Sequence, residues 1–324
     1  MLPVFLAACG APPWNSPYPV ADEGGNISYS SFAERPKHLD PAQSYSSNEI
    51  TFTGQIYEPP LQYHYLKRPY TLIPLAAAEL PKAQFLDAQE KPLPAESAAE
   101  KIAFSMYEIR IRPGVRYQPH PAFARDAQGR YLYHDLKPED LAKVFKLSDF
   151  SQTGTRELEA ADYVHQIKRL AHPKLNSPIF GMMGEYIIGL REYAKVLDRE
   201  QKALPPGARL DLTRYPLAGV EVVDRHTYRV KLKGKYPQFL YWLAMPFFAP
   251  VPPEADHFYG QPGMAEKNLT LDWYPVGTGP YMLVENNPNS RMVLRRNWRV
   301  RASDGQLSAK DGRQFALRGA QPGE

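Results

Sequence analysis

The sequence predicts a mixed α/β protein, and three stretches carry most of that prediction. Between Tyr107 and Arg112, apolar and polar side chains alternate, which is typical of a strand with one buried face. Residues 220–232 contain two runs rich in Val, Tyr and Leu that are joined by a polar turn at 224–226, the pattern of a β-hairpin. Apolar residues at helical spacing over residues 155–171 predict a helix. Both kinds of element are therefore expected in one domain.

The remaining elements follow from local signals. Residues 26–30 alternate like a strand, and residues 48–57 have a helical pattern that stops before Pro59 and Pro60. A helix is expected to begin at Pro138, because proline is favoured at the first helical position and acidic residues are favoured in the first turn. Its apolar face would consist of Leu141, Val144 and Phe145.

Composition limits the class of protein. A chain of 324 residues corresponds to roughly two domains, and 43% hydrophobic residues are enough to form a core. The single Cys excludes a disulfide framework, and no apolar run approaches the ~18 residues that a membrane-spanning helix needs. The net charge of +4 is small, and the arginines near residues 291–301 stand outside any recognisable nucleic-acid module. Nucleic acid is therefore not an expected partner.

The sequence lacks the common catalytic motifs. It has no G-x-S-x-G elbow, no H-E-x-x-H pair and no P-loop, and the Gly-x-Gly at 277–279 lacks the third glycine of a dinucleotide site. The eight histidines include no pair at the i, i+4 spacing of a helical metal site, although His120 and His134 lie in one loop-like stretch. We expect no enzyme activity, no cofactor and no metal. A secreted hydrolase with a triad spread along the chain stays an alternative.

The N-terminus predicts an export signal. Residues 1–9 are apolar and end in LAAC, which resembles the bacterial lipoprotein box, in which the cysteine is acylated. Cys9 is therefore the expected lipidation site, and residues 10–25, rich in Pro and Gly, would form a linker. This signal predicts a periplasmic or extracytoplasmic protein that is anchored to the membrane by lipid. The alternative is a lone cysteine without a role.

A series of short motifs follows in a distinctive order. They are PKHLDPA at 36–42, QIYEPPL at 55–61, LIPLA at 72–76, RPGVRY at 112–117, LKPEDL at 136–141, the hairpin at 220–232, PVGTGPY at 275–281 and VLRRN at 293–297. In order and spacing, residues 26–298 resemble the family 5 solute-binding proteins of ABC importers, the oligopeptide-, dipeptide- and nickel-binding class. The GTGPY motif is the most specific of these segments.

The resemblance implies a fold and a division of the chain. The fold would be a periplasmic-binding-protein-like (type II) two-lobe clamp, represented here mainly by the N-terminal lobe and its inserted subdomain. Residues 26–57 and 205–276 would form lobe I and residues 58–204 the inserted subdomain. Residues 277–298 would cross into a second lobe that is largely missing, and residues 299–324 have no assignment.

The resemblance also implies a function. The chain would be an extracytoplasmic solute-binding lipoprotein that delivers peptides, or a related small solute, to an ABC importer. Its partners would be that ligand and the permease subunits, with membrane contact through the lipid only and a monomeric state. Nickel in place of a peptide stays open, and the alternative to transport is a truncated lipoprotein that binds nothing.

Two groups of residues would act in this function. The ligand-binding residues implied by the resemblance are Tyr45, Ser46, Ser47 and Tyr281, and the crossover between lobes is at Gly277, Thr278, Gly279 and Pro280. The glycines of the crossover are expected because they adopt backbone angles that other residues avoid. Two simpler alternatives remain open: the serines cap the following helix, and the tyrosine only packs the crossover strand.

Overall fold

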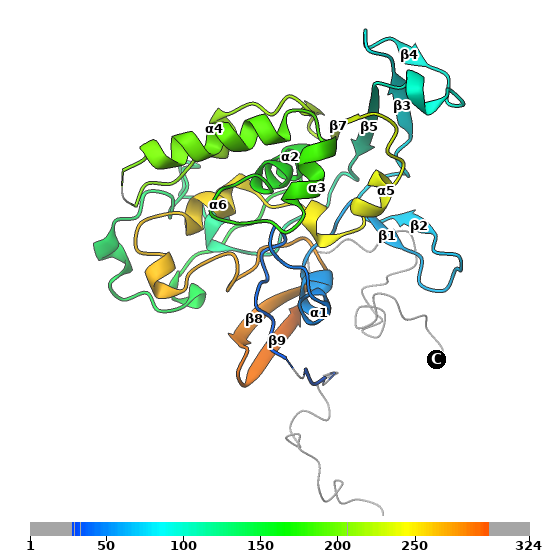
Figure 1. Cartoon of the computed structure of the whole chain (residues 1–324). Coiled ribbons are helices and arrows are strands. Elements are labelled where there is room, and N and C mark those ends of the chain that lie inside the picture. The colour runs from blue at the N-terminus through cyan, green and yellow to red at the C-terminus, as the bar shows by residue number, and fades with distance from the viewer. Residues whose placement is uncertain (1–27, 29, 33, 206, 298–324) are drawn as a thin grey trace, which may run out of the picture.

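The computed structural model describes residues 28, 30–32, 34–205 and 207–297 (Figure 1). Cys9, the linker 10–25, most of the predicted strand at 26–30 and the tail 299–324 lie outside the described residues. In the described part, helices and strands are mixed along the chain, as predicted.

The largest of the three sheets in the described residues is five-stranded and antiparallel, with the strand order β4-β3-β5-β7-β6. The strands are β3 (Ala83–Leu86), β4 (Pro92–Leu93), β5 (Phe104–Arg110), β6 (Val220–Asp224) and β7 (Thr227–Lys233). The sheet thus pairs a strand near residue 107 with the hairpin at 220–233, which lies more than a hundred residues later in the chain.

The strand and the hairpin expected from the sequence are both confirmed. In β5, Tyr107 and Ile109 are buried while Glu108 is half-buried, the alternation that predicted the strand. The strand begins three residues before Tyr107 and ends at Arg110. At the hairpin turn, the His226 backbone N–H donates to Asp224 Oδ1 at 2.8 Å, which closes the turn.

Three α-helices lie between β5 and β6 in the chain (Figure 1). They are α2 (Ala160–Arg169), which packs against β6 and β7, α3 (Phe180–Tyr186) and α4 (Leu190–Ala203). The helix predicted over residues 155–171 is present as α2 but begins later than predicted, at Ala160. The Leu158 N–H donates to the Val115 carbonyl at 2.8 Å, so the chain before Ala160 runs extended beside residues 115–117 and is not free to form helical bonds.

The prediction of an α-helix that begins at Pro138 is wrong. Only a 3-10 turn forms, Pro138–Leu141, and a second one follows at Leu147–Asp149. Asp149 causes the break, because its carboxylate accepts the backbone N–H groups of Phe145 and Lys146 at 2.8 and 3.1 Å. Of the predicted apolar face, Leu141 is buried, but Phe145 is 73% exposed.

The remaining elements surround the sheet. Helix α1 (Ser47–Ile56) confirms the prediction for 48–57, and two further short helices are present. Two small hairpins complete the structure. These elements are α5 (Phe239–Trp242), α6 (Pro253–Tyr259), β1 (Leu61–Tyr63) paired with β2 (Leu72–Pro74), and β8 (Tyr281–Asn287) paired with β9 (Arg291–Arg296).

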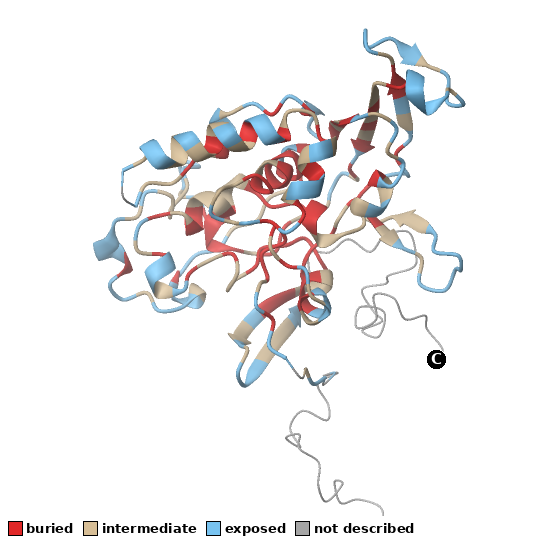
Figure 2. Cartoon of the chain, viewed as in Figure 1, coloured by how far each residue is buried: buried red, intermediate tan, exposed pale blue. Residues whose placement is uncertain are grey.

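The buried residues, red in Figure 2, include the apolar side chains of a large and a small cluster. The large cluster draws residues from the sheet and from α2, α4 and α6, among them Tyr107, Tyr228 and Phe258. The small cluster lies where α1 meets β8 and includes Ile56 and Leu283. The division into lobe I, inserted subdomain and crossover stays a prediction.

Candidate functional site

Two of the predicted ligand-binding residues, Tyr45 and Ser46, end a loop at residues 37–46 that is held in place by a buried carboxylate of α1. Glu49 Oε1 accepts the backbone N–H groups of Lys37 and His38 at 3.1 and 2.9 Å. Its other oxygen, Oε2, accepts those of Tyr45 and Ser46 at 2.8 and 3.0 Å. One side chain therefore ties both ends of the loop to the first turn of the helix, where a negative charge is also favoured by the helix dipole.

The environment of Glu49 keeps this carboxyl group ionised. Burial raises its pKa, but the N–H groups of Ser46, Tyr45 and His38 outweigh that effect, and the pKa lies below the ordinary value of 4.5. The charged form is the one that accepts all four hydrogen bonds. The loop conformation therefore depends on an ionised Glu49.

A second carboxylate holds the middle of the loop. Asp272 Oδ1 accepts the backbone N–H groups of Leu39 and Asp40 at 2.8 and 2.9 Å, and its Oδ2 lies 2.8 Å from His38 Nδ1. Asp272 comes from the segment before the GTGPY motif, so this contact joins the loop to a segment 233 positions later in the sequence.

A buried ion pair fixes the loop from the inside. Asp40 pairs with Arg169 of α2, and the same guanidinium donates from Nε to Asp256 of α6 at 2.9 Å. His165 Nε2 lies 2.8 Å from Asp256 Oδ2. Although burial opposes the charged form, Arg169 and His165 hold the pKa of Asp256 well below its usual range. Loop, α2 and α6 are thereby linked in one polar network.

The predicted ligand-binding side chains of this loop have different environments. Tyr45 is 65% exposed, and its ring centre lies 6.1 Å from that of the buried Phe247. Ser46 is the N-cap of α1 in a capping box with Glu49, as the simpler alternative for the serines expects. Ser47 is exposed at the first position of the helix. Tyr45 thus presents an aromatic face outward from an immobilised backbone.

The predicted crossover at Gly277, Thr278, Gly279 and Pro280 is fully buried against the end of α1. The Gly279 N–H donates to the Ile56 carbonyl at 2.7 Å. The Gly277 N–H donates to the side-chain Oε1 of Gln118 at 3.2 Å. A Cβ on Gly277 would lie 1.9 Å from the Ile56 oxygen. The predicted reason for Gly277 and Gly279, unusual backbone angles, is therefore wrong, because neither is among the residues with positive φ. Glycine is needed here because the backbone of the crossover approaches the backbone of Ile56 too closely for a side chain.

Tyr281 follows the crossover as the first residue of β8 and is half-buried. Burial raises the pKa of its hydroxyl, which stays protonated at neutral pH. Strand β8 packs against α1, the helix that also holds the loop of Tyr45. The two predicted regions are therefore anchored on one helix, Tyr45 before its start and Tyr281 beside it.

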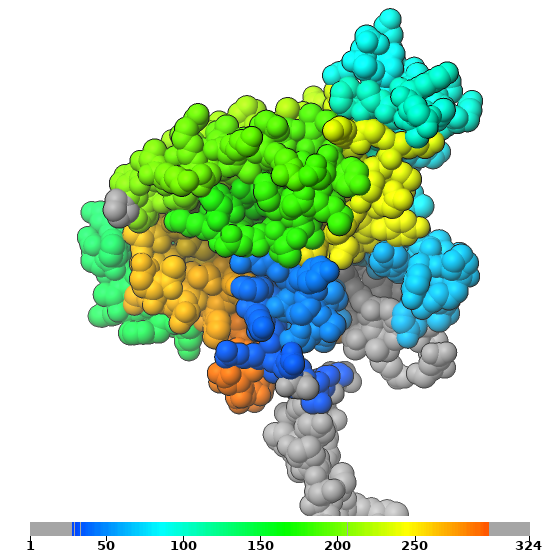
Figure 3. Space-filling model, viewed as in Figure 1, coloured from blue at the N-terminus to red at the C-terminus, as the bar shows by residue number. Residues whose placement is uncertain are grey.

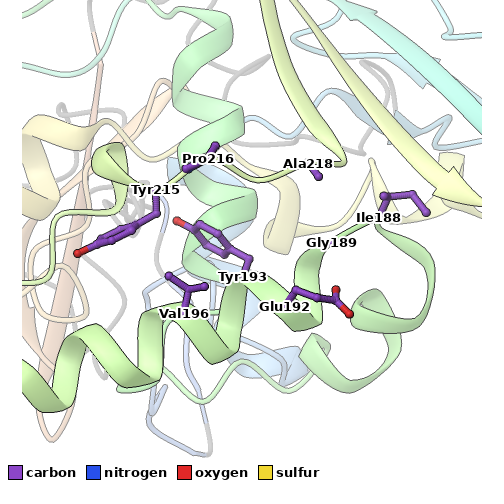
Figure 4. A pocket seen from close by; sticks show the side chains of 8 residues that line it. All are labelled: Ile188, Gly189, Glu192, Tyr193, Val196, Tyr215, Pro216 and Ala218. Atoms are coloured by element: carbon purple, nitrogen blue, oxygen red, sulfur yellow. The ribbon is translucent and has the colours of Figure 1, made fainter.

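A surface hollow of about 580 Å³ lies elsewhere, between α4 and residues 215–218 (Figure 4). Tyr193, Val196 and Tyr215 line it, and Glu192 is its one charged side chain. Within the described residues, no group of three or more His, Cys, Asp or Glu side chains is arranged to hold a metal ion. In the same residues, no helix is both long and apolar enough to cross a membrane.

Sequence reasoning missed the residues that hold the loop. The spacing of Ser46 and Glu49 is that of a capping box and was available as a signal. Asp272 and Arg169 carried no such signal, because their partners lie more than a hundred positions away in the chain.

The sequence and the fold both match known proteins. Residues 144–304 match the family described as "Bacterial extracellular solute-binding proteins, family 5 Middle". No curated protein matches the chain. A periplasmic oligopeptide-binding protein (OppAIV) from Borrelia burgdorferi has a similar structure, with a TM-score of 0.51, 16% identity and coverage of 83% of this chain.

Further structures align over a similar extent. The Escherichia coli murein tripeptide binding protein MppA gives a TM-score of 0.49 with 17% identity over 83% of this chain, and Burkholderia pseudomallei OppA gives 0.49 with 18% over 83%. The chain spans between 37% and 39% of the length of these three structures. The similarity to the Borrelia protein shows a periplasmic-binding-protein fold for the part that is present.

Proposed function

Since the chain belongs to the family 5 extracellular solute-binding proteins, we propose that it binds peptides outside the cytoplasm and delivers them to an ABC importer. The observation that carries this proposal is the loop at 37–46. Two carboxylates, those of Glu49 and Asp272, hold its backbone, and the Asp40–Arg169 ion pair ties it to α2. Tyr45 is left exposed at its end. A preformed backbone with an exposed aromatic side chain binds a flexible ligand at a smaller entropic cost than a mobile loop would.

In this proposal Tyr45 provides an apolar face for a peptide side chain, while Ser46 and Ser47 provide hydroxyl groups at the start of α1. Tyr281 forms the other border of the site, and the buried crossover at 277–280 holds it beside α1. An extended peptide is held mainly through its backbone, which allows many sequences to bind. Closure of a second lobe over the ligand is the step that a permease would detect.

We further propose that acylation of Cys9 anchors the protein, with residues 10–25 as the tether. Replacing Cys9 by Ser removes the acylation site. We expect the parent in the membrane fraction and the Cys9→Ser variant in the soluble fraction. Equal partitioning of the two would contradict the anchor and would leave the peptide proposal untouched.

The binding site is tested with Tyr45→Ala and a pool of tri- to pentapeptides, with binding measured by titration calorimetry. The variant loses the aromatic contact that a bound peptide would bury, and we expect binding to weaken about tenfold or more. Phe145→Ala is the matched control, since Phe145 is also exposed but lies in a different segment. Equal affinities for Tyr45→Ala, Phe145→Ala and the parent would contradict the assignment of Tyr45.

A further inference from the structure

The hairpin of β1 and β2 carries a group of exposed aromatic and aliphatic side chains. Figure 3 shows this hairpin in light blue as a knob that projects from the body of the protein. The group, here called the tyrosine tip, consists of Tyr63, Tyr65, Leu66, Tyr70 and the neighbouring Tyr241 of α5, each between 44% and 65% exposed.

Contacts within the tyrosine tip hold it together. The Tyr63 ring stacks on Tyr241 with centroids 6.2 Å apart and meets the edge of Tyr70 at 5.9 Å. The Arg68 guanidinium lies 4.6 Å from the centre of the Tyr70 ring, and its Nη1 donates to the carbonyls of Tyr65 and Lys67. The tip is therefore a shaped surface and not a set of isolated side chains.

The charge of this surface is one-sided. Lys67 and Arg68 are exposed, and neither forms a salt bridge within the described part of the chain. Residues 59–78 contain no Asp or Glu, and neither do residues 235–253, which supply Tyr241. The local excess of positive charge is thus not compensated by either segment.

These features together fit a lipid interface better than a small ligand. Tyrosine is enriched where membranes meet water, because its ring is apolar and its hydroxyl is polar. Basic residues next to such rings are attracted to anionic headgroups. Sites for small molecules are concave, whereas this hairpin projects outward.

We propose that the tyrosine tip docks on a bilayer surface that contains anionic phospholipids. Tyr65 and Leu66 enter the headgroup region, and Lys67 and Arg68 face the phosphate groups. This contact is separate from any acyl chain on Cys9. It would set the orientation of the protein at the membrane, which an acyl chain alone does not.

The test is vesicle co-sedimentation of the 324-residue chain carrying Cys9→Ser, so that no acyl chain contributes. Vesicles of phosphatidylcholine that contain about 30% phosphatidylglycerol are compared with vesicles of phosphatidylcholine alone. The variants are Tyr65→Ser with Leu66→Ser, and Lys67→Gln with Arg68→Gln. All four positions are exposed, so folding is expected to be retained, and circular dichroism verifies it.

We expect binding that requires phosphatidylglycerol. Removing both cations should weaken it about 30-fold, because each basic residue near an anionic surface contributes a factor of about five. The matched control is Phe145→Ser with Lys146→Gln, an exposed aromatic–lysine pair in another segment, which should bind like the parent.

Three results would overturn the proposal. The first is no sedimentation with either kind of vesicle. The second is sedimentation that both tip variants retain. The third is a dimer in sedimentation velocity that Tyr65→Ser with Leu66→Ser abolishes, which would identify a second copy of the chain as the occupant of the tip.

Discussion

Arg169 and Asp40 form a buried ion pair with two hydrogen bonds, from Nη1 to Oδ1 at 2.9 Å and from Nη2 to Oδ2 at 2.6 Å. Both side chains are less than 5% exposed. The pair joins helix α2 to the loop that carries Tyr45, across 129 positions of sequence. The same guanidinium also pairs with the half-buried Asp256, so one side chain neutralises two carboxylates.

Replacing Arg169 by Met should destabilise the protein strongly. The variant leaves the buried Asp40 without its cation and also removes the partner of the half-buried Asp256, and breaking a buried pair in this way costs about 3–5 kcal/mol. Urea unfolding at pH 7 measures the effect. The control is Arg191→Met, which removes an exposed pair with Glu185 and should cost at most about 1 kcal/mol. Similar losses in both variants would be inconsistent with a special role for Arg169.

Replacing Glu49 by Gln should loosen the loop and change the pH dependence of stability. The amide retains one acceptor oxygen for four N–H groups, and we expect a loss of about 2 kcal/mol at pH 7. Since the folded pKa of Glu49 is lowered, the unfolded chain takes up a proton first as the pH falls. The advantage of the parent is therefore complete above pH 4.5 and is lost as the pH falls through the folded pKa.

Thermal unfolding of the parent and of Glu49→Gln across this pH range measures the difference. Glu96→Gln serves as the control, since Glu96 is exposed and its replacement should change the stability little. An unchanged difference between parent and Glu49→Gln at all pH values would refute the ionised clamp.

Replacing Gly277 by Ala should be strongly destabilising. The added Cβ meets the Ile56 carbonyl oxygen at 1.9 Å, and two backbone segments must separate to admit it. A loss of about 3 kcal/mol is expected, within the range for backbone conflicts. Gly54→Ala in α1 is the control: its Cβ meets nothing within 4 Å, and alanine favours the helix by up to about 1 kcal/mol. Equal stability of the two variants would show that the crossover is not tightly packed.

Acid should weaken the fold through His120. This ring is fully buried, with Nδ1 accepting the Ala122 N–H and Nε2 lying 2.7 Å from the Tyr259 hydroxyl. Burial lowers the pKa of His120 from 6.5 to about 3. Between these two values the unfolded chain binds a proton that the folded chain does not, so stability falls as the pH falls.

NMR titration of the His120 ring tests this directly, because a neutral ring keeps its chemical shifts down to about pH 3. His120→Gln should be less stable than the parent at pH 7, and the gap should narrow on acidification. A His120 ring that titrates near pH 6.5 in the folded protein would contradict the account.

Much of the fold was predictable from local patterns, because the elements concerned depend on their own sequence. The strand around Tyr107 and the hairpin at 220–233 follow from alternation, and α1 follows from apolar spacing and the Pro-Pro stop. The helix expected at Pro138 failed because Asp149 captures two backbone N–H groups, a side-chain competition that periodicity does not show.

Only a few of the contacts that hold the loop of Tyr45 in place were predictable from the sequence. Ser46 and Glu49 form a local motif, whereas Asp40 meets Arg169 and Asp272 only after the chain has folded. The crossover glycines were predicted to matter because of unusual backbone angles, which is not the reason that the structure gives. The neighbour that excludes a side chain, the Ile56 carbonyl, lies about 220 positions earlier in the chain and has no signature in the sequence.

The central claim is that this chain binds peptides, and native mass spectrometry tests it most directly. The parent chain is mixed with an equimolar pool of tri- to pentapeptides and, separately, with a pool of sugars and free amino acids. We predict a complex that carries one peptide and no adduct from the second pool. Adducts from the second pool alone, or none from the peptide pool, would contradict a peptide-binding function.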